Sequence, residues 1–215
     1  MIVKLITHTE SPEITVAAAA RVCYASTGSD AELIRKLVKM GHLSPLEHAS
    51  FTFSVDGISR ACSHQLVRHR IASFSQRSQR YVSEDGFGFV IPPGIDDATL
   101  LIFRGAMRDL QKAYNRLIGF GIPKEDARYV LPNACETSLV VTMNARSLLH
   151  FFEVRCCTRA QWEIRRLARE MLAEVRKVAP VLFEKAGPKC ETEGICPEGT
   201  MSCGRWKRAE MGQLP

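Results

Sequence analysis

Residues 51–68 of the chain read FTFSVDGISRACSHQLVR, and this stretch contains both kinds of element that the fold is expected to have. Phe51, Phe53 and Val55 alternate with polar residues, which is the period-two pattern of a strand with one buried face. From residue 58 to about 68 the sequence is typical of a helix. The stretch therefore predicts a strand that leads directly into a helix.

The same order recurs later in the chain. Alternation over 139–143 predicts a second strand, and helices are predicted near 145–156 and 160–178. A long amphipathic helix is predicted around 103–117, because apolar residues recur there in steps of three and four. Few strands among many helices predict an α+β fold.

Local signals complete the expected elements. Residues 2–7 predict a short strand, and Ser11-Pro12 predicts the start of a helix. Capping boxes of the form Ser-x-x-Glu are predicted at Ser29–Glu32 and Ser44–Glu47. Residues 71–90 are rich in Ser, Gln, Arg and Gly, which predicts an extended, exposed segment.

The length and composition favour one soluble domain. The chain has 215 residues, of which 46% are hydrophobic and 24% are charged. It has no apolar run of membrane-spanning length, and its first residues do not resemble a signal peptide, so a cytoplasmic protein is expected. Apolar content falls from Gly187 onward, which predicts a domain over 1–186 and a tail over 187–215 that contains Cys, Gly and Pro.

The charge balance points to anionic ligands. The chain has 29 Lys and Arg against 23 Asp and Glu, a formal net charge of +6. Such an excess suits nucleic acid or small phosphorylated molecules, and ordinary solubility charge is the alternative. Its eight cysteines are expected to be reduced thiols, because a chain of this size needs no disulfide framework.

The densest functional signal is RHRIASFSQRSQR at residues 68–80, with four arginines, one histidine and several hydroxyl and amide side chains. If the segment is extended, Gln76, Ser78 and Arg80 share one side. Guanidinium groups and hydroxyls together suit phosphate. The alternative is a solvated basic loop.

The tail cysteines raise the question of a metal. Cys190, Cys196 and Cys203 lack the paired C-x2-C spacing of zinc sites, although Cys156 and Cys157 could complete a set if the tail folds back. No metal site is predicted, and the tail is expected to be mobile.

Five blocks in this sequence resemble the flavin-dependent thymidylate synthases. The first is Arg68-His69-Arg70 followed after seven residues by Ser78. The others are GHLSPLEH (41–48), ARYVLP (127–132), NARSL (144–148) and AQWEI (160–164). The resemblance covers roughly residues 1–186.

This resemblance implies a homotetramer with active sites at subunit interfaces and a mostly antiparallel sheet packed with long helices. It implies the synthesis of dTMP from dUMP, with 5,10-methylenetetrahydrofolate as carbon donor, NADPH as reductant and FAD as hydride relay. It implies that the protein binds neither nucleic acid nor a membrane. The flavin supplies the difficult chemistry in such enzymes, while the protein binds, orients and polarises.

The resemblance also assigns residues to FAD. The implied flavin-binding residues are His42, Ser44, Glu47, Arg68, His69, Arg70, Ile71, Asn144, Arg146 and His150. His150 departs from the Asn that is usual in the family. A helix-end histidine is the alternative for His69, and a solvent face with an ion pair to Glu153 is the alternative for Arg146.

A second set is assigned to dUMP. The implied residues are Gln65, Arg68, Gln76, Ser78, Gln79, Arg80, Arg128 and Arg155. Gln76 replaces a frequent Glu of the family, and Gln79 replaces a frequent Gly. Arg155 is implied to favour ionisation at N3 of the pyrimidine, and a helix C-terminal arginine that meets the macrodipole is its alternative.

Ser78 and the cysteines decide whether catalysis is covalent. No base for Ser78 is evident in the sequence, so it is interpreted as a substrate ligand whose loss would reduce turnover. No Cys-His pair occurs, so the classical cysteine nucleophile is not expected. Two rival hypotheses are a nucleic-acid-binding module and a flavoprotein oxidase. The scarcity of aromatic residues disfavours the first. The presence of Arg155 and of the implied dUMP ligands within 76–80 disfavours the second.

Overall fold

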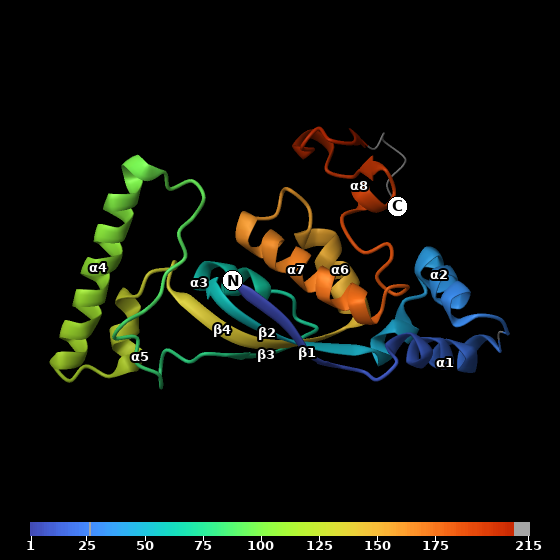
Figure 1. Ribbon diagram of the computed structural model, residues 1–215, viewed down its shortest axis with the longest axis horizontal. Coiled ribbons are helices and arrows are strands. Elements are labelled where there is room, and N and C mark those ends of the chain that lie inside the picture. Colours follow the sequence, from blue (N-terminus) through green and yellow to red (C-terminus); the bar gives the residue numbers. More distant parts are fainter. Residues whose placement is uncertain (26, 209–215) are drawn as a thin grey trace. The chain divides into compact units, whose positions relative to one another are not determined.

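The computed structural model describes residues 1–25 and 27–208 (Figure 1). The helices in this part are α1 (Pro12–Tyr24), α2 (Asp30–Met40), α3 (Arg60–Leu66), α4 (Asp97–Gly119), α5 (Lys124–Ala127), α6 (Ala145–Arg155), α7 (Trp162–Val178) and α8 (Lys189–Thr192). Short 3-10 helices are η1 (Ser44–His48), η2 (Arg128–Val130) and η3 (Gly199–Met201). The strands are β1 (Ile2–His8), β2 (Ser50–Ser59), β3 (Ser73–Gln76), β4 (Glu136–Asn144), β5 (Ile195–Cys196) and β6 (Lys207–Arg208).

The α+β class predicted from the sequence is confirmed. Four strands form an antiparallel sheet in the order β1-β2-β4-β3. The alternation in β2 has the predicted effect, because Phe51, Phe53 and Val55 are fully buried. Leu139 and Val141 of β4 are buried in the same alternating way. No helix in the described residues is both long and apolar enough to cross a membrane.

The chain divides into two compact units that are discontinuous in sequence. The first unit consists of residues 1–2, 55–68 and 74–140. The second unit consists of residues 3–54, 69–73 and the described chain from 141 onward. The predicted boundary between residues 186 and 187 is a different kind of division, and it stays a prediction.

The first unit is organised around α4, which contacts α5 and η2. Asp96 and Thr99 form a capping box at its start, so the helix begins earlier than the apolar spacing predicts. Gln111 holds the segment before α4, since its side chain donates to Glu84 O at 2.7 Å and accepts from Phe87 N at 2.8 Å.

These contacts correct the prediction that residues 71–90 are exposed. Glu84 and Phe87 are buried, at 4% and 9% exposure. Phe87 belongs to an apolar cluster with Met107 of α4 and Cys135. The polar composition of the segment hid this local core, because Phe87 and the partly buried Phe89 are its members from residues 71–90.

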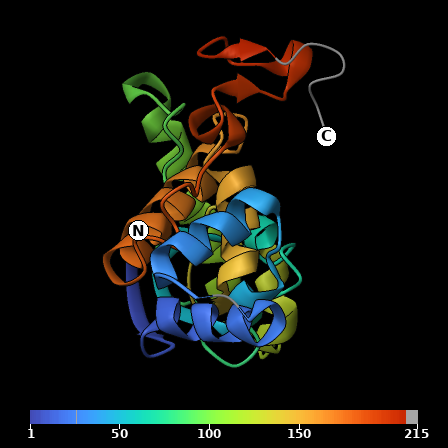
Figure 2. The ribbon, with the colours of Figure 1, turned by 90° about the vertical axis from the view of Figure 1, so that its right-hand side faces the viewer.

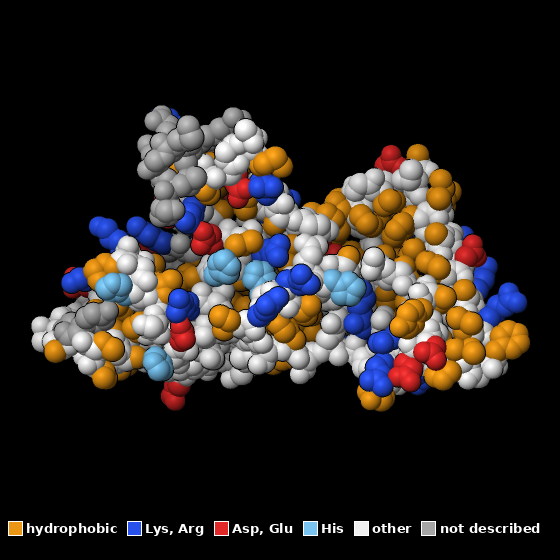
Figure 3. All heavy atoms as spheres, turned by 180° about the vertical axis from the view of Figure 1, so that it is seen from behind, with side chains coloured by type: hydrophobic (Ala, Val, Ile, Leu, Met, Phe, Trp, Pro, Cys, Tyr) orange, Lys and Arg blue, Asp and Glu red, His pale blue; other side chains and the backbone are white. Residues whose placement is uncertain are grey.

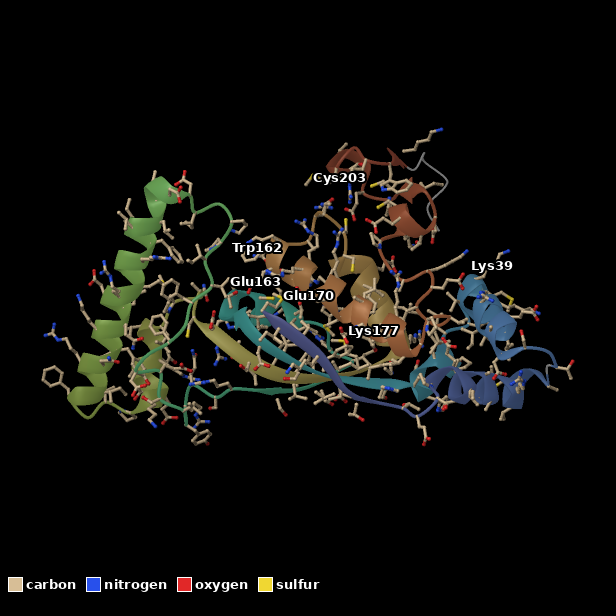
Figure 4. The ribbon with its side chains drawn as sticks, in the orientation of Figure 1. Lys39, Trp162, Glu163, Glu170, Lys177 and Cys203 are labelled. Atoms are coloured by element: carbon tan, nitrogen blue, oxygen red, sulfur yellow. The ribbon has the colours of Figure 1, made fainter. Side chains whose placement is uncertain are left out.

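The second unit contains α6 and α7, which contact each other, and α1, which contacts α2 and η1. The helix predicted near 160–178 is α7, and its apolar residues Ile164, Leu167, Met171 and Val175, spaced three and four apart, are fully buried. Trp162, at the start of α7 (Figure 4), is only half-buried.

The helix starts of the second unit show which capping predictions hold. Ser29 accepts a hydrogen bond from Glu32 N, which is one of the two bonds of the predicted capping box, and Gly41 follows the end of α2 in the left-handed conformation. Ser11 precedes α1 without a side-chain cap. The predicted capping box at Ser44–Glu47 is wrong, because these residues form the 3-10 helix η1 and the Glu47 carboxylate pairs elsewhere.

The tail is folded as far as residue 208. The short strands β5 and β6 pair in parallel, Ile195 with Lys207 and Cys196 with Arg208 (Figure 2, red arrows). Cys190 on α8 and Cys196 on β5 are buried. The tail therefore has regular elements and two buried thiols, while its expected mobility stays a prediction.

Candidate active site

The second unit brings Arg155 to His69. Arg155 is the last residue of α6, and its Nε donates a hydrogen bond of 3.0 Å to Nε2 of His69. Both side chains are half-buried. Phe151, one turn earlier on α6, meets the His69 ring edge-on at 4.9 Å between centroids. The buried face of α6 thus fixes the position from which Arg155 reaches the histidine.

His69 is neutral at pH 7. Burial, then the charge of Arg155 and then His150 lower the pKa of His69 to about 4. Because Nε2 accepts from Arg155, the single ring proton lies on Nδ1. His69 therefore orients Arg155 through a hydrogen bond and does not neutralise the guanidinium charge.

Two of the predicted flavin-binding blocks meet at an ion pair. Nη1 of Arg146 lies 2.5 Å from Oε1 of Glu47, and both side chains are about half-exposed. This pair, together with contacts between η1 and α6, joins residues 41–48 to residues 144–150. Arg146 thus pairs with Glu47 and not with Glu153, which was the alternative. Oε1 of Glu153 instead lies 3.7 Å from Nζ of Lys189.

The other residues of these blocks have varied settings. Asn144 is the N-cap of α6, where its Oδ1 accepts from Ser147 N at 2.8 Å. His42, Ser44 and His150 are exposed. The His150 and His69 rings lie 6.2 Å apart, so the third block also reaches the Arg68-His69-Arg70 motif.

A cavity of about 380 Å³ in the second unit is lined by both blocks. Its polar lining residues are Arg146, His150, Glu153, Lys185, Lys189, Thr192 and Glu193. Of its three cationic side chains, Arg146 pairs with Glu47 and Lys189 lies 3.7 Å from Glu153, so the lining carries charges of both signs. Exposed Lys, Arg and His side chains are also visible on the face shown in Figure 3.

In the first unit, Gln76 is oriented by buried hydroxyls. Its Nε2 donates to Ser63 Oγ at 2.9 Å and to Thr137 Oγ1 at 3.2 Å. The Ser63 hydroxyl donates to Arg60 O at 3.0 Å, so it can only accept from Gln76. The amide therefore has one defined orientation.

Two predicted substrate-binding arginines lie around Glu125. Nη2 of Arg80 lies 2.9 Å from Oε2 of Glu125, and Arg128 Nε donates to the Glu125 carbonyl oxygen at 3.0 Å. The Arg80–Glu125 pair is about half-exposed, and such pairs contribute less than ~1 kcal/mol. Arg80 can therefore exchange Glu125 for an anionic ligand at small cost.

The prediction that Gln76, Ser78 and Arg80 share one side of a strand is wrong. β3 ends at Gln76, and a turn follows. Arg80 N donates to Ser78 Oγ at 3.1 Å, and Val82 N donates to Ser78 O at 3.1 Å. The serine hydroxyl thus closes a turn with its own backbone, which competes with an extended chain.

The remaining predicted residues lie in both units. In the first, Gln65 Nε2 donates to Ala61 O at 3.5 Å within α3, and Gln79 Nε2 approaches Cys135 Sγ at 3.6 Å. Arg68, also in the first unit, is exposed. Arg70 and Ile71, in the second unit, are exposed as well, Ile71 at 74%.

Cys135 is unsuited to act as a nucleophile. Its side chain is fully buried, and burial, followed by the charge of Glu84, raises the pKa of the thiol to about 11. Only a minute fraction is thiolate at pH 7.

Several residues that orient the site were not predicted from the sequence. Ser63 and Thr137 hold Gln76, Glu125 holds Arg80, and Phe151 packs on His69. Thr137 lies two residues before Leu139 and so continues the alternation of the predicted strand, which is a local signal that its side chain is buried. The other contacts join residues far apart in sequence, and no local pattern reports them.

Comparisons with known proteins agree with the resemblance. Residues 4–181 match the family model Thy1, thymidylate synthase complementing protein. A relative from Geobacter sulfurreducens named flavin-dependent thymidylate synthase is 55% identical, and the match covers 100% of this chain and 97% of the relative. A relative of the same name from Clostridium tetani is 52% identical, and the match covers 99% of this chain and 96% of the relative. Another of the same name from Sulfurisphaera tokodaii is 44% identical, and the match covers 88% of this chain and 79% of the relative.

Proposed function

Because the chain belongs to the family of thymidylate synthase complementing proteins, we propose that it is a flavin-dependent thymidylate synthase. It converts dUMP to dTMP. The balanced reaction takes a one-carbon unit from 5,10-methylenetetrahydrofolate, a hydride from NADPH and a proton from solvent, and it releases tetrahydrofolate and NADP⁺. The structural observation that carries this proposal is the Arg155 guanidinium, oriented by a neutral histidine.

The chemistry of the side chains fits a flavin dinucleotide. The guanidinium and ammonium groups of Arg146, Lys185 and Lys189 in the cavity of the second unit are donors that suit a pyrophosphate. The half-buried, neutral His69 suits an uncharged ring system. The residues that would hold FAD are His42, Ser44, Glu47, Arg68, His69, Arg70, Ile71, Asn144, Arg146 and His150. Bound FAD would supply hydride transfer, which no amino-acid side chain provides.

Arg155 is the proposed catalytic cation. A fixed guanidinium beside the pyrimidine stabilises negative charge on the ring as it develops. Because His69 is neutral, it orients the Arg155 guanidinium without neutralising it. Loss of such a preorganised group typically costs about 3 kcal/mol of transition-state stabilisation.

The other proposed dUMP ligands are Gln65, Arg68, Gln76, Ser78, Gln79, Arg80 and Arg128. Arg80 would bind phosphate in place of its Glu125 partner. Ser78 is proposed as a catalytic-site ligand that positions the substrate and forms no covalent bond. Its hydroxyl accepts from Arg80 N, and neighbouring cations do not ionise a hydroxyl.

The oligomeric state, reductant and location also belong to the proposal. The family resemblance favours a homotetramer whose active sites lie at subunit interfaces, with dUMP as small-molecule substrate and no nucleic-acid or membrane partner. NADPH and 5,10-methylenetetrahydrofolate are proposed as co-substrates, and the cytoplasm as the place of action.

Tritium release from dUMP labelled at C5 of the uracil tests the proposal. The purified protein should be yellow, release FAD on denaturation, and liberate tritium only when FAD, NADPH and the folate are all present. A colourless protein that cannot be reconstituted with FAD would refute the flavin. Tritium release that persists without folate would refute the methylation.

A further inference from the structure

A second cavity of the second unit lies between α2 and the segment that follows α7. Its volume is about 530 Å³, within the ~300–1,000 Å³ that is usual for small-molecule sites. Lys36 and Lys39 of α2 and Lys185 after α7 are among its lining residues, and Figure 4 labels Lys39 on α2. Three ammonium groups from two distant segments thus line one cavity.

The positive charge of this cavity is not cancelled by the described residues. Arg35 Nε donates to Glu184 Oε2 at 2.7 Å, so these two lining charges offset each other. The three lysines form no ion pair within the described part of the chain. Glu193 is the remaining carboxylate among the described lining residues. Three ammonium groups against one carboxylate favour an anionic ligand.

The rest of the lining is apolar. Leu182 is only 1% exposed, and Val38 and Val181 are partly buried. The methylene stems of lysines extend such an apolar surface while their ammonium groups stay in water. Ammonium groups beside an apolar wall suit a ligand that has both a phosphate and a flat ring, more than they suit a simple ion.

This cavity adjoins the cavity that is lined by residues of the flavin-binding blocks. Four residues line both cavities: Val38, Lys185, Thr192 and Glu193. The adjoining cavity contains Arg146 and His150, which would hold FAD. A reductant must place its reactive atom against the flavin that it reduces. The cavity beside the flavin site is therefore suitably placed for the other end of that reductant.

We propose that the cavity between α2 and residues 181–185 binds the 2′-phosphoadenosine end of NADPH, with Lys36 and Lys39 as partners of the 2′-phosphate. This inference rests on the proposed function, because it assigns a place to the reductant of that reaction. A phosphate monoester carries about −1.5 to −2 charge at pH 7, and ammonium groups bind it as point charges. NADH lacks this phosphate, so the two lysines select NADPH.

Lysine acetylation tests the site without turnover. The purified holoprotein is treated with limiting acetic anhydride, with and without adenosine 2′,5′-bisphosphate, and its peptides are mapped by mass spectrometry. The bisphosphate should slow acetylation of Lys36 and Lys39 several-fold, and adenosine should not. Lys112 on α4 is the internal control, because its side chain is 74% exposed and lies in the first unit. Unchanged labelling of Lys36 and Lys39 would overturn the inference.

A double variant, Lys36→Ala with Lys39→Ala, tests the selectivity. The KM for NADPH in flavin reduction should rise roughly tenfold, since loss of one exposed ammonium–phosphate contact weakens binding up to about fivefold. The KM for NADH should not change. Anaerobic loss of the yellow absorbance, with dUMP present and the folate omitted, measures this step apart from methylation.

The flavin content of the double variant should be unchanged, because Lys36 and Lys39 do not line the adjoining cavity. Lys112→Ala is the matched control, and it should change neither KM. Both lysines of the double variant are exposed on α2, so the substitutions leave the buried face of the helix as it is.

Several outcomes overturn the inference and leave the proposed function standing. One is an unchanged KM for NADPH in the double variant. Another is a raised KM for the folate alone, which would assign the lysines to its carboxylates. A third is a loss of FAD, which would assign them to the flavin. Failure of the proposed function has a different signature, namely no tritium release although the bisphosphate protects both lysines.

Discussion

The hydrogen bond from Nε of Arg155 to Nε2 of His69, 3.0 Å long, ties the end of α6 to the Arg68-His69-Arg70 motif. Although Arg155 lies in the last turn of its helix, its guanidinium is directed to a specific acceptor. A carboxylate in that place would neutralise the cation. A neutral imidazole orients it and leaves its charge for a ligand.

His69 should make the stability of the folded chain depend on pH. Its pKa is about 4 when folded and near 6.5 when unfolded, so between these values the unfolded state binds more protons. Stability should be full above about pH 6.5 and should fall as the pH drops toward 4. Denaturant unfolding from about pH 7.5 to about pH 4.5 should show His69→Asn losing ~1 kcal/mol less than the unaltered protein. Equal losses in both proteins would contradict the neutral, buried histidine.

Arg155→Ala should lower kcat for dTMP formation by at least ~100-fold, because it removes a preorganised cation. The yellow colour and FAD content should be retained. Arg159→Ala is a matched control, since Arg159 is exposed and pairs with Glu198 outside the proposed ligand set. Tritium release gives the rates, and normal turnover in Arg155→Ala would refute the proposed role.

Gln76 and Thr137 should be energetically coupled. Gln76→Ala and Thr137→Val each remove the 3.2 Å hydrogen bond between them, and each should destabilise the fold by ~1–2 kcal/mol. In the double variant the losses should be less than additive by ~0.5–1 kcal/mol. Urea unfolding of the four proteins measures this, and strict additivity would mean that the bond contributes nothing.

Cys135→Ala and Cys62→Ala should remain active. Cys135 is fully buried with its pKa raised to about 11, and Cys62 is also fully buried, so neither is suited to attack a substrate. Each variant should lose ~1 kcal/mol of stability from the small cavity it creates. A folded variant without activity would reopen covalent catalysis by cysteine.

Glu47→Gln should separate stability from cofactor binding. The Glu47–Arg146 pair is about half-exposed, so its loss should change the free energy of unfolding by less than ~1 kcal/mol. If Glu47 helps to hold FAD, flavin occupancy should fall several-fold. Glu174→Gln, which breaks an exposed pair with Lys177 on α7, should leave occupancy unchanged. Equal occupancy in both variants would remove Glu47 from the proposed site.

The sequence predicted the elements whose signals are local. The alternation at Phe51–Val55 marks β2, the spacing of Ile164, Leu167, Met171 and Val175 marks the buried face of α7, and Ser29 and Gly41 mark the ends of α2. These predictions hold because burial of one face imposes a period on neighbouring residues. The family resemblance likewise came from short blocks that can be recognised along the chain.

Only the tertiary structure decided what the polar side chains touch. Ser44–Glu47 has the letters of a capping box, yet Glu47 pairs with Arg146, 99 residues away. The position of Arg155 would also allow an interaction with the C-terminal end of its own helix, but its guanidinium donates a hydrogen bond to His69. A periodic pattern reports only whether a side chain faces the core. The partner of a charged or hydrogen-bonding group depends on which distant segment packing brings within about 3 Å.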